Sequence, residues 1–187
     1  ELAKIVKDFD LKITVIMGGA HPTAAPESVL IDNNVDVAVL GEGDATIIPL
    51  LQLIEKNASL SELEGIGYRD IDGKIILQGT GKQVEDMDDI PFPARHLLPM
   101  EKYFSAGIRH GGIGKGKRSA SIITSRGCQY LCNFCTAFKV FSRRPRMRSR
   151  DNVLAEIDEL VNKYNVDEIY FEDDQLLAKR DRAISLF

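Results

Sequence analysis

The amino-acid sequence predicts an α/β fold in which parallel strands are followed by helices. In the N-terminal part, the apolar runs 11–17 and 35–40 both end in glycines, and helical periodicity follows each of them. Near the C-terminus, strands expected at 119–125 and 167–171 are separated by a loop and a helix. A strand–loop–helix–strand order is typical of the start of a (β/α) barrel, whose loops at the carboxyl ends of the strands carry the chemistry.

The composition is that of an ordinary globular protein. The 187 residues are 44% hydrophobic and 28% charged, with a net charge of −4. This mild acidic balance gives no reason to expect a nucleic-acid partner, and no apolar run approaches the ~20 residues of a membrane-spanning helix. The first residue is Glu1, and Phe187 falls within an apolar-periodic run. We therefore expect an internal fragment of a longer cytoplasmic protein, without a signal peptide.

The expected N-terminal elements follow from the spacing of apolar residues. Residues 1–9 place an apolar stripe on one side of a helix, and the β-rich run 11–17 follows as a buried strand. A helix is expected at 24–33 and a second buried strand at 35–40. Asp44 suits the N-cap of the next helix, whose apolar residues are Ile47, Ile48, Leu50, Leu51 and Ile54.

The middle of the chain changes character. Apolar residues alternate on both sides of Asp72-Gly73, a dipeptide that signals a tight hairpin within 65–79. Residues 86–100 contain three prolines and several acids, and residues 107–116 contain five glycines. We therefore expect a domain at 1–85, a linker at 86–118 and a second domain at 119–187.

The segment 111–118 nearly matches a phosphate-binding loop. That pattern requires Ser or Thr directly after Gly-Lys and a helix beyond it. Here Arg118 stands at that position and a strand is expected next. A basic loop is therefore favoured over a nucleotide site.

All three cysteines lie together, as Cys128, Cys132 and Cys135 in a Cys-x3-Cys-x2-Cys arrangement. Three thiolates so close in sequence can surround one metal centre, and in a four-iron cluster they would leave one iron open to another ligand. The alternatives are a disulfide with one free thiol, a zinc site completed by a fourth ligand, or buried inert cysteines. The histidines that zinc could use are His21, His96 and His110.

The cysteine segment resembles the motif of the radical S-adenosylmethionine (radical SAM) enzymes, including the aromatic Phe134 before its last cysteine. Other segments resemble the cobalamin-dependent members of that superfamily, namely Gly18-Gly19-Ala20-His21-Pro22, residues 35–44, residues 91–100 and Ser125-Arg126-Gly127-Cys128. The Asp-x-His-x-x-Gly motif of those proteins does not occur, so His21 is not expected to bind cobalt.

The resemblance implies a fold and a set of sites. Residues 1–85 would form the C-terminal half of a Rossmann-like cobalamin-binding domain, and residues 119–187 the first strands and helices of a radical SAM partial TIM barrel. Cys128, Cys132 and Cys135 would hold a 4Fe-4S cluster. The residues beside S-adenosylmethionine (SAM) would be Phe134, Asp173 and Asp174, with Glu172 as a further candidate. Those beside cobalamin would be Gly18, Gly19, Gly41, Glu42 and Gly43.

The charged segments also have simpler interpretations. Anionic side chains can bind the SAM ammonium by charge-assisted hydrogen bonds, but Asp and Glu at a strand end are often only solvated. The six basic residues within 139–150 could neutralise an anionic substrate or cofactor, although such a run is usually a solvated face.

The implied activity is reductive cleavage of SAM to methionine and a 5′-deoxyadenosyl radical, which takes a hydrogen from a small-molecule substrate. Cobalamin would serve methyl transfer, a cyclisation or a rearrangement, and a flavodoxin or ferredoxin would donate the electron. We expect the fragment alone to be inactive, because the rest of the barrel is missing. Two alternatives are a zinc-stabilised interaction module with an anionic partner and a methylthiotransferase-like radical SAM protein, a class that usually carries additional upstream cysteines.

Overall fold

The computed structural model describes residues 1–106 and 118–186. The chain divides into two compact units. The first contains residues 1–84 together with 127–144, and the second contains the remaining described residues. The segment with all three cysteines thus belongs to the same unit as the N-terminal residues. The assignment of 1–85, 86–118 and 119–187 to a cobalamin-type domain, a linker and a barrel stays a prediction.

The first unit is built on a four-stranded sheet with the order β1-β2-β3-β4. Ile16 of β1 pairs with Val37 of β2 in parallel, and Tyr68 of β3 pairs with Ile76 of β4 in an antiparallel hairpin. Both the parallel pair and the hairpin were expected from the sequence. The buried strand expected at 11–17 was wrong in extent, because only Ile16–Met17 pair with β2 and residues 11–14 are exposed. The strands are β1 (Ile16–Met17), β2 (Val37–Val39), β3 (Ile66–Arg69) and β4 (Ile75–Leu77).

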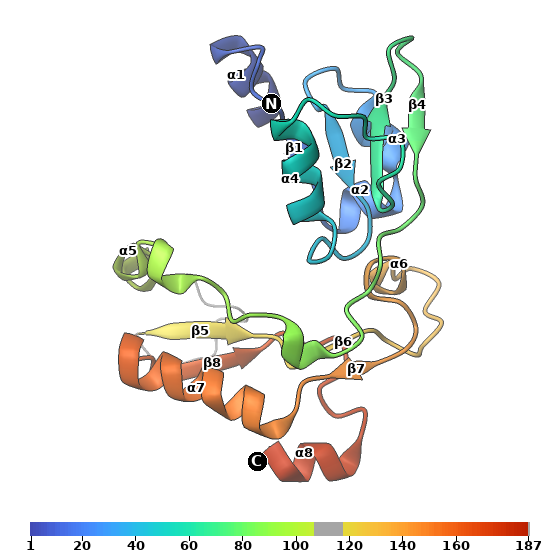
Figure 1. Ribbon diagram of the computed structural model, residues 1–187. Coiled ribbons are helices and arrows are strands. Elements are labelled where there is room, and N and C mark those ends of the chain that lie inside the picture. Colours follow the sequence, from blue (N-terminus) through green and yellow to red (C-terminus); the bar gives the residue numbers. More distant parts are fainter. Residues whose placement is uncertain (107–117, 187) are drawn as a thin grey trace. The chain divides into compact units, whose positions relative to one another are not determined.

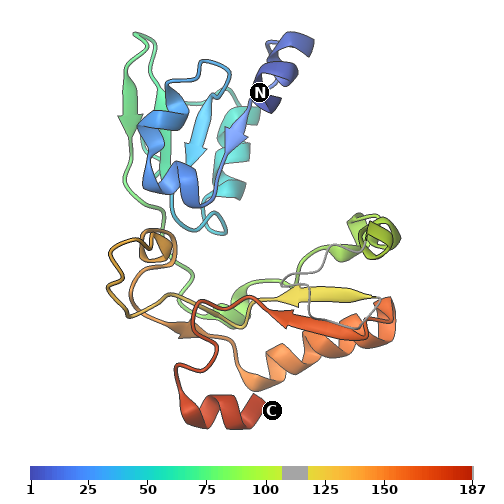
Figure 2. The same ribbon diagram turned by 180° about the vertical axis from the view of Figure 1, so that it is seen from behind.

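Helices cover both faces of this sheet, as Figures 1 and 2 show from opposite sides. Ala38 and Leu40 pack with Leu30 on one face, whereas Val37 and Val39 pack with Leu50 on the other. This alternation is the period of two that a strand covered on both faces requires. The helices of the unit are α1 (Leu2–Phe9), α2 (Ala20–Ala24), α3 (Pro26–Leu30), α4 (Ile47–Glu55) and α6 (Ala137–Phe141).

Two helix predictions in this unit were wrong in detail. The single helix expected at 24–33 is interrupted at Ala25, whose φ of −145° and ψ of 65° are not helical. Pro26 follows, and a proline disfavours the helical conformation of the residue before it. Helix α4 begins at Ile47 with Thr46 as its N-cap rather than at Asp44. The cause is a turn in which the Thr46 N–H donates to the Gly43 carbonyl (3.0 Å).

The second unit contains a parallel strand pair covered by a long helix. Ser119 of β5 pairs with Glu168 of β8, and Ile122 with Phe171. Helix α7 lies along this pair (Figure 1), and its Val153 packs with Ile122 in the core of the unit. Elements of this unit are β5 (Ser119–Ile122), β6 (Ser125–Arg126), β7 (Arg146–Met147), β8 (Glu168–Phe171), α5 (Met100–Ala106), α7 (Arg150–Tyr164) and α8 (Arg180–Leu186), with 3-10 turns Met87–Asp89 and Arg95–Leu97.

Two sequence predictions in this unit were wrong in detail, and a third falls mostly outside the described residues. The strand expected at 119–125 is split into β5 and β6. The N-cap of α7 is Ser149, whose side chain accepts the Asn152 N–H (3.1 Å), and not Asp151. The segment that resembles a phosphate-binding loop lies, except for Arg118, outside the described residues. Among the helices that are described, none is long and apolar enough to cross a membrane.

Candidate functional site

The cysteine segment begins at a glycine that no other residue could replace without strain. Gly127 has a φ of +94°, and a Cβ at this position would lie 2.6 Å from the Arg144 carbonyl oxygen and 3.0 Å from that of Phe141. The Cys128 N–H donates to the Ser142 carbonyl (3.3 Å). These contacts hold the beginning and the end of segment 127–144 together, so the cysteines are carried on a closed loop.

The thiols are accessible on this loop. Cys132 is exposed, Cys128 and Cys135 are partly exposed, and all three are free of disulfides. The Cys135 N–H donates to the Cys132 carbonyl (3.2 Å), which forms a turn between the second and third thiols just before α6. Within the described residues, no three His, Cys, Asp or Glu side chains are gathered as a metal-binding group. The donor set nevertheless consists of three soft thiols, the ligand type that iron–sulfur clusters use.

Large apolar side chains on the same loop face solvent. Phe134 is 86% exposed, and Leu131 and Tyr130 are 69% and 57% exposed. Apolar side chains that protrude beside accessible thiols provide a surface on which a ligand can pack. The role expected for Phe134 beside SAM stays a prediction.

The acidic triplet follows β8 in the second unit, and its members differ in environment. Asp173 is partly buried, whereas Glu172 and Asp174 are exposed. The Thr124 N–H donates to both carboxylate oxygens of Asp173 (3.1 Å each), and the Thr124 hydroxyl donates to one of them (2.8 Å). The Ser125 hydroxyl donates to the same carboxylate. Asp173 therefore joins the end of β8 to the residues that lead into the cysteine segment.

Thr124 is the residue on which these contacts converge. It is fully buried, and its carbonyl accepts the Arg148 N–H (2.9 Å) and a guanidinium N–H of Arg182 (2.9 Å). Burial lowers the pKa of Arg182, and the negative charge of Asp173 opposes that shift. Sequence reasoning missed both Thr124 and Arg182, because neither belongs to a motif and Arg182 lies 58 residues from its partner.

The glycine motifs lie at one edge of the first unit's sheet, because β1 and β2 are parallel. A Cβ on Gly18 would lie 3.6 Å from the Val39 Cβ, so the two strand ends are adjacent. Gly19 and Gly41 have positive φ values of 104° and 81°, and the Gly41 N–H donates to the Thr23 hydroxyl (2.9 Å). Gly18 and Gly19 are exposed, Gly43 is partly exposed, and Gly41 and Glu42 are buried.

The basic run 139–150 is not the uniformly solvated face that was expected. Arg146 and Arg148 are only 5% and 8% exposed, whereas Arg143 and Arg144 are exposed. Glu156 on α7 accounts for the burial of Arg148, with which it forms an ion pair. No pattern in the sequence indicated this pairing.

Comparison with known proteins identifies relatives over nearly the whole chain. It is 34% identical over 91% of its length to cytidylyl-2-hydroxyethylphosphonate methyltransferase of Streptomyces wedmorensis. It is 33% identical over 99% of its length to an uncharacterized methyltransferase of Pyrococcus horikoshii. It is 29% identical over 97% of its length to the anaerobic magnesium-protoporphyrin IX monomethyl ester cyclase of Rubrivivax gelatinosus. The chain spans 36%, 38% and 32% of these three proteins. No protein-family model matches the chain.

Solved structures share the fold. The cobalamin-dependent S-adenosylmethionine radical enzyme OxsB, solved with aqua-cobalamin and SAM, superposes with a TM-score of 0.74 at 22% identity, over 99% of this chain and 25% of OxsB. The radical SAM methyltransferase TsrM of Kitasatospora setae, solved with tryptophan and a SAM analogue, gives a TM-score of 0.75 at 18% identity, over 99% of this chain and 34% of TsrM. Together with the sequence relatives, these matches show that the chain belongs to the family of cobalamin-dependent radical SAM enzymes.

Proposed function

We propose that this chain is part of an enzyme that binds a 4Fe-4S cluster through Cys128, Cys132 and Cys135 and uses SAM and cobalamin. The observation that carries the proposal is the concentration of all the thiols of the chain on one loop that is closed by Gly127. The kinship with cobalamin-dependent radical SAM enzymes supports the same cofactors. When bound, the cluster supplies the electron for reductive cleavage of SAM.

The residues of the chain would prepare this chemistry rather than perform it. The three cysteines would bind iron as thiolates, and their exposure allows iron and sulfide to reach them. Asp174 would bind the SAM ammonium, because its exposed carboxylate is accessible to a ligand. Asp173 already accepts three N–H or O–H groups from Thr124 and Ser125. It would therefore act mainly by holding the residues that precede the cysteine segment.

The reaction catalysed by the whole protein is proposed to be a methyl transfer, with a cyclisation as the second candidate. The first two relatives are methyltransferases and the third is a cyclase. The substrate would be a small molecule held by the parts of the protein that those relatives have in addition. We propose that the isolated chain binds the cluster but turns SAM over weakly or not at all.

The test is anaerobic reconstitution with iron and sulfide, followed by iron and sulfide analysis and electron paramagnetic resonance with and without SAM. We expect about four irons per chain and a signal that shifts when SAM is added. Cys132→Ser should abolish the signal without unfolding the protein, because the thiol is exposed. Asn133→Ala, at the adjacent exposed position, is the matched control and should retain it.

Two outcomes would contradict the proposal. One zinc per chain without iron or sulfide would favour a zinc-stabilised interaction module. A cluster that forms equally well in Cys132→Ser would show that the loop is not its site.

A further inference from the structure

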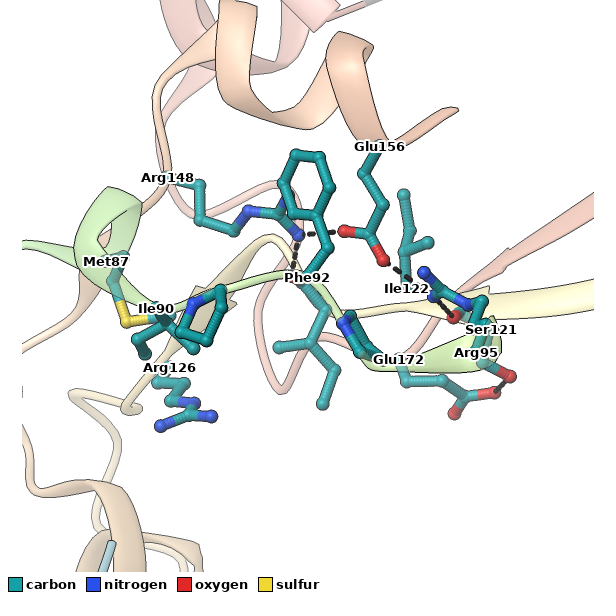
Figure 3. A pocket seen from close by; sticks show the side chains of 13 residues that line it. Met87, Ile90, Phe92, Arg95, Ser121, Ile122, Arg126, Arg148, Glu156 and Glu172 are labelled. Atoms are coloured by element: carbon teal, nitrogen blue, oxygen red, sulfur yellow. Dashed lines mark hydrogen bonds and ion pairs between the residues drawn. The ribbon is translucent and has the colours of Figure 1, made fainter. Parts of the chain in front are cut away.

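A cavity of about 230 Å³ lies in the second unit, and none of the three cysteines lines it. Its walls come from the proline-rich stretch 87–95, from strand β5 and from helix α7. Most of the wall is apolar and includes Ile90, Phe92 and Ile122. Figure 3 shows these side chains around a group of arginines and glutamates.

A buried carboxylate lies between two guanidinium groups at this cavity (Figure 3). Glu156 is 1% exposed, and one of its oxygens accepts from Arg95 Nη2 (2.6 Å) while the other accepts from Arg148 Nη1. Arg95 and Arg148 are themselves only 6% and 8% exposed. One carboxylate can neutralise only one of these two cations, so the group as a whole is positive.

The two arginines differ in how far their donors are used. Arg148 donates to Glu156, to the Ile123 carbonyl (2.9 Å) and to the Asn152 side chain (2.6 Å) and carbonyl (3.3 Å). Arg95 Nη2 donates to Glu156 and, at 3.4 Å, to the Ser121 carbonyl. Arg95 Nη1 is buried and has no hydrogen-bond partner within the described residues. Leaving a buried charged donor unsatisfied costs more free energy than leaving a neutral donor unsatisfied.

The charges at the cavity also favour an anionic ligand. The buried group of Arg95, Arg148 and Glu156 carries two positive charges and one negative charge. A surplus positive charge in an apolar surrounding is unfavourable unless an anion accompanies it. The planar guanidinium group is also the side chain best suited to oxyanions, because its N–H groups match two adjacent oxygens.

We propose that this cavity binds a small oxyanion, the carboxylate or phosphate of a ligand whose remainder is apolar, with Arg95 as the residue that recognises it. Arg148 and Glu156 hold the Arg95 guanidinium in place. The apolar wall formed by Ile90, Phe92 and Ile122 receives the rest of the ligand. This proposal does not rest on the cluster or on the SAM chemistry proposed above, although Glu172, the further SAM candidate named from the resemblance, also lines the cavity.

The proposal can be tested on the chain with methyl-labelled isoleucine and NMR titration by butyrate, acetate and inorganic phosphate. Sodium chloride at equal ionic strength corrects for screening. We expect saturable shifts of the Ile90 and Ile122 methyl signals. Tighter binding of butyrate than of acetate would identify a carboxylate on an apolar chain, and tightest binding of phosphate would identify a phosphoryl group.

Arg95→Lys is the decisive variant, because it keeps the charge and the partner for Glu156 but removes the second guanidinium nitrogen. We expect it to weaken anion binding on the order of tenfold, which is one interaction of about 1.4 kcal/mol. Arg150→Lys is the matched control, since Arg150 is an exposed arginine of α7 that does not line the cavity, and it should leave binding unchanged.

The proposal is overturned if the wild-type chain shows no saturable shift at Ile90 and Ile122, a result that needs no variant. It is equally overturned if Arg95→Lys and Arg150→Lys weaken binding to the same extent, because general charge attraction would then explain it.

Discussion

Replacing Asp173 by Asn should destabilise the second unit, because the carboxylate joins two strand ends. Three donors from Thr124 and Ser125 point at it, and Thr124 is fully buried. A hydrogen bond to a charged group contributes about 1.5–3 kcal/mol. Asn retains one oxygen acceptor but turns an NH2 group toward the other donors. Since neighbouring contributions are not additive, we expect a loss of about 2–4 kcal/mol of unfolding free energy.

Urea unfolding followed by circular dichroism measures this loss, and hydrogen exchange at the Thr124 amide localises it. With a urea dependence of about 2 kcal/mol per molar, the midpoint of the affected transition should fall by about 1–2 M. Asp174→Asn is the control, because the adjacent Asp174 is exposed and its replacement should stay within about 0.5 kcal/mol. Equal effects of the two substitutions would refute the reasoning, since the contacts of Asp173 would then contribute nothing beyond charge.

Three further perturbations have expected outcomes. Gly127→Ala should lower the unfolding free energy measured in urea by about 2 kcal/mol or more. Gly73→Ala, at a position with a positive φ of 79° but no atom within 4 Å of the added Cβ, should lower it by about 1 kcal/mol. Equal losses would show that the carbonyl contacts of Gly127 add nothing to the cost of its positive φ. Glu156→Gln should lower the unfolding free energy by about 3–5 kcal/mol, because it leaves two buried cations without their carboxylate, and a change below about 1 kcal/mol would contradict that. Hydrogen bonding to Arg118 lowers the pKa of Glu101 from its ordinary 4.5. The stabilisation that this ion pair gives the folded state is therefore present above pH 4.5 and is lost as the pH falls through the lowered pKa. NMR titration of the Glu101 carboxylate should show a midpoint that returns toward 4.5 in Arg118→Met.

Local patterns were enough to predict most of the elements. The apolar runs 11–17 and 35–40 contain β1 and β2, which are parallel as expected, although β1 covers only the last two residues of its run. Asp72-Gly73 lies between the strands of the β3–β4 hairpin. These features depend on neighbours within a few residues, and the sequence displays such neighbours directly.

Features that depend on distant partners were not predictable in this way. Asp173 was proposed from the family resemblance, but its hydrogen bonds to Thr124, 49 residues away, could not be read from any spacing. The same is true of the Arg95–Glu156 pair, whose members are 61 residues apart. The prediction of a solvated basic run was wrong for Arg148 because a single carboxylate on α7 pairs with it. Burial of charge is decided by such long-range pairs, and a window of sequence does not contain them.

The assignment of segment 127–144 to the first unit has a consequence for the order of folding. That unit is discontinuous in sequence, since residues 85–126 of the second unit lie between its two parts. During synthesis, the sheet of this unit can form from residues 1–84, whereas segment 127–144 can join it only after residue 144 has left the ribosome. The thiol loop is therefore among the later parts of this unit to reach its native contacts.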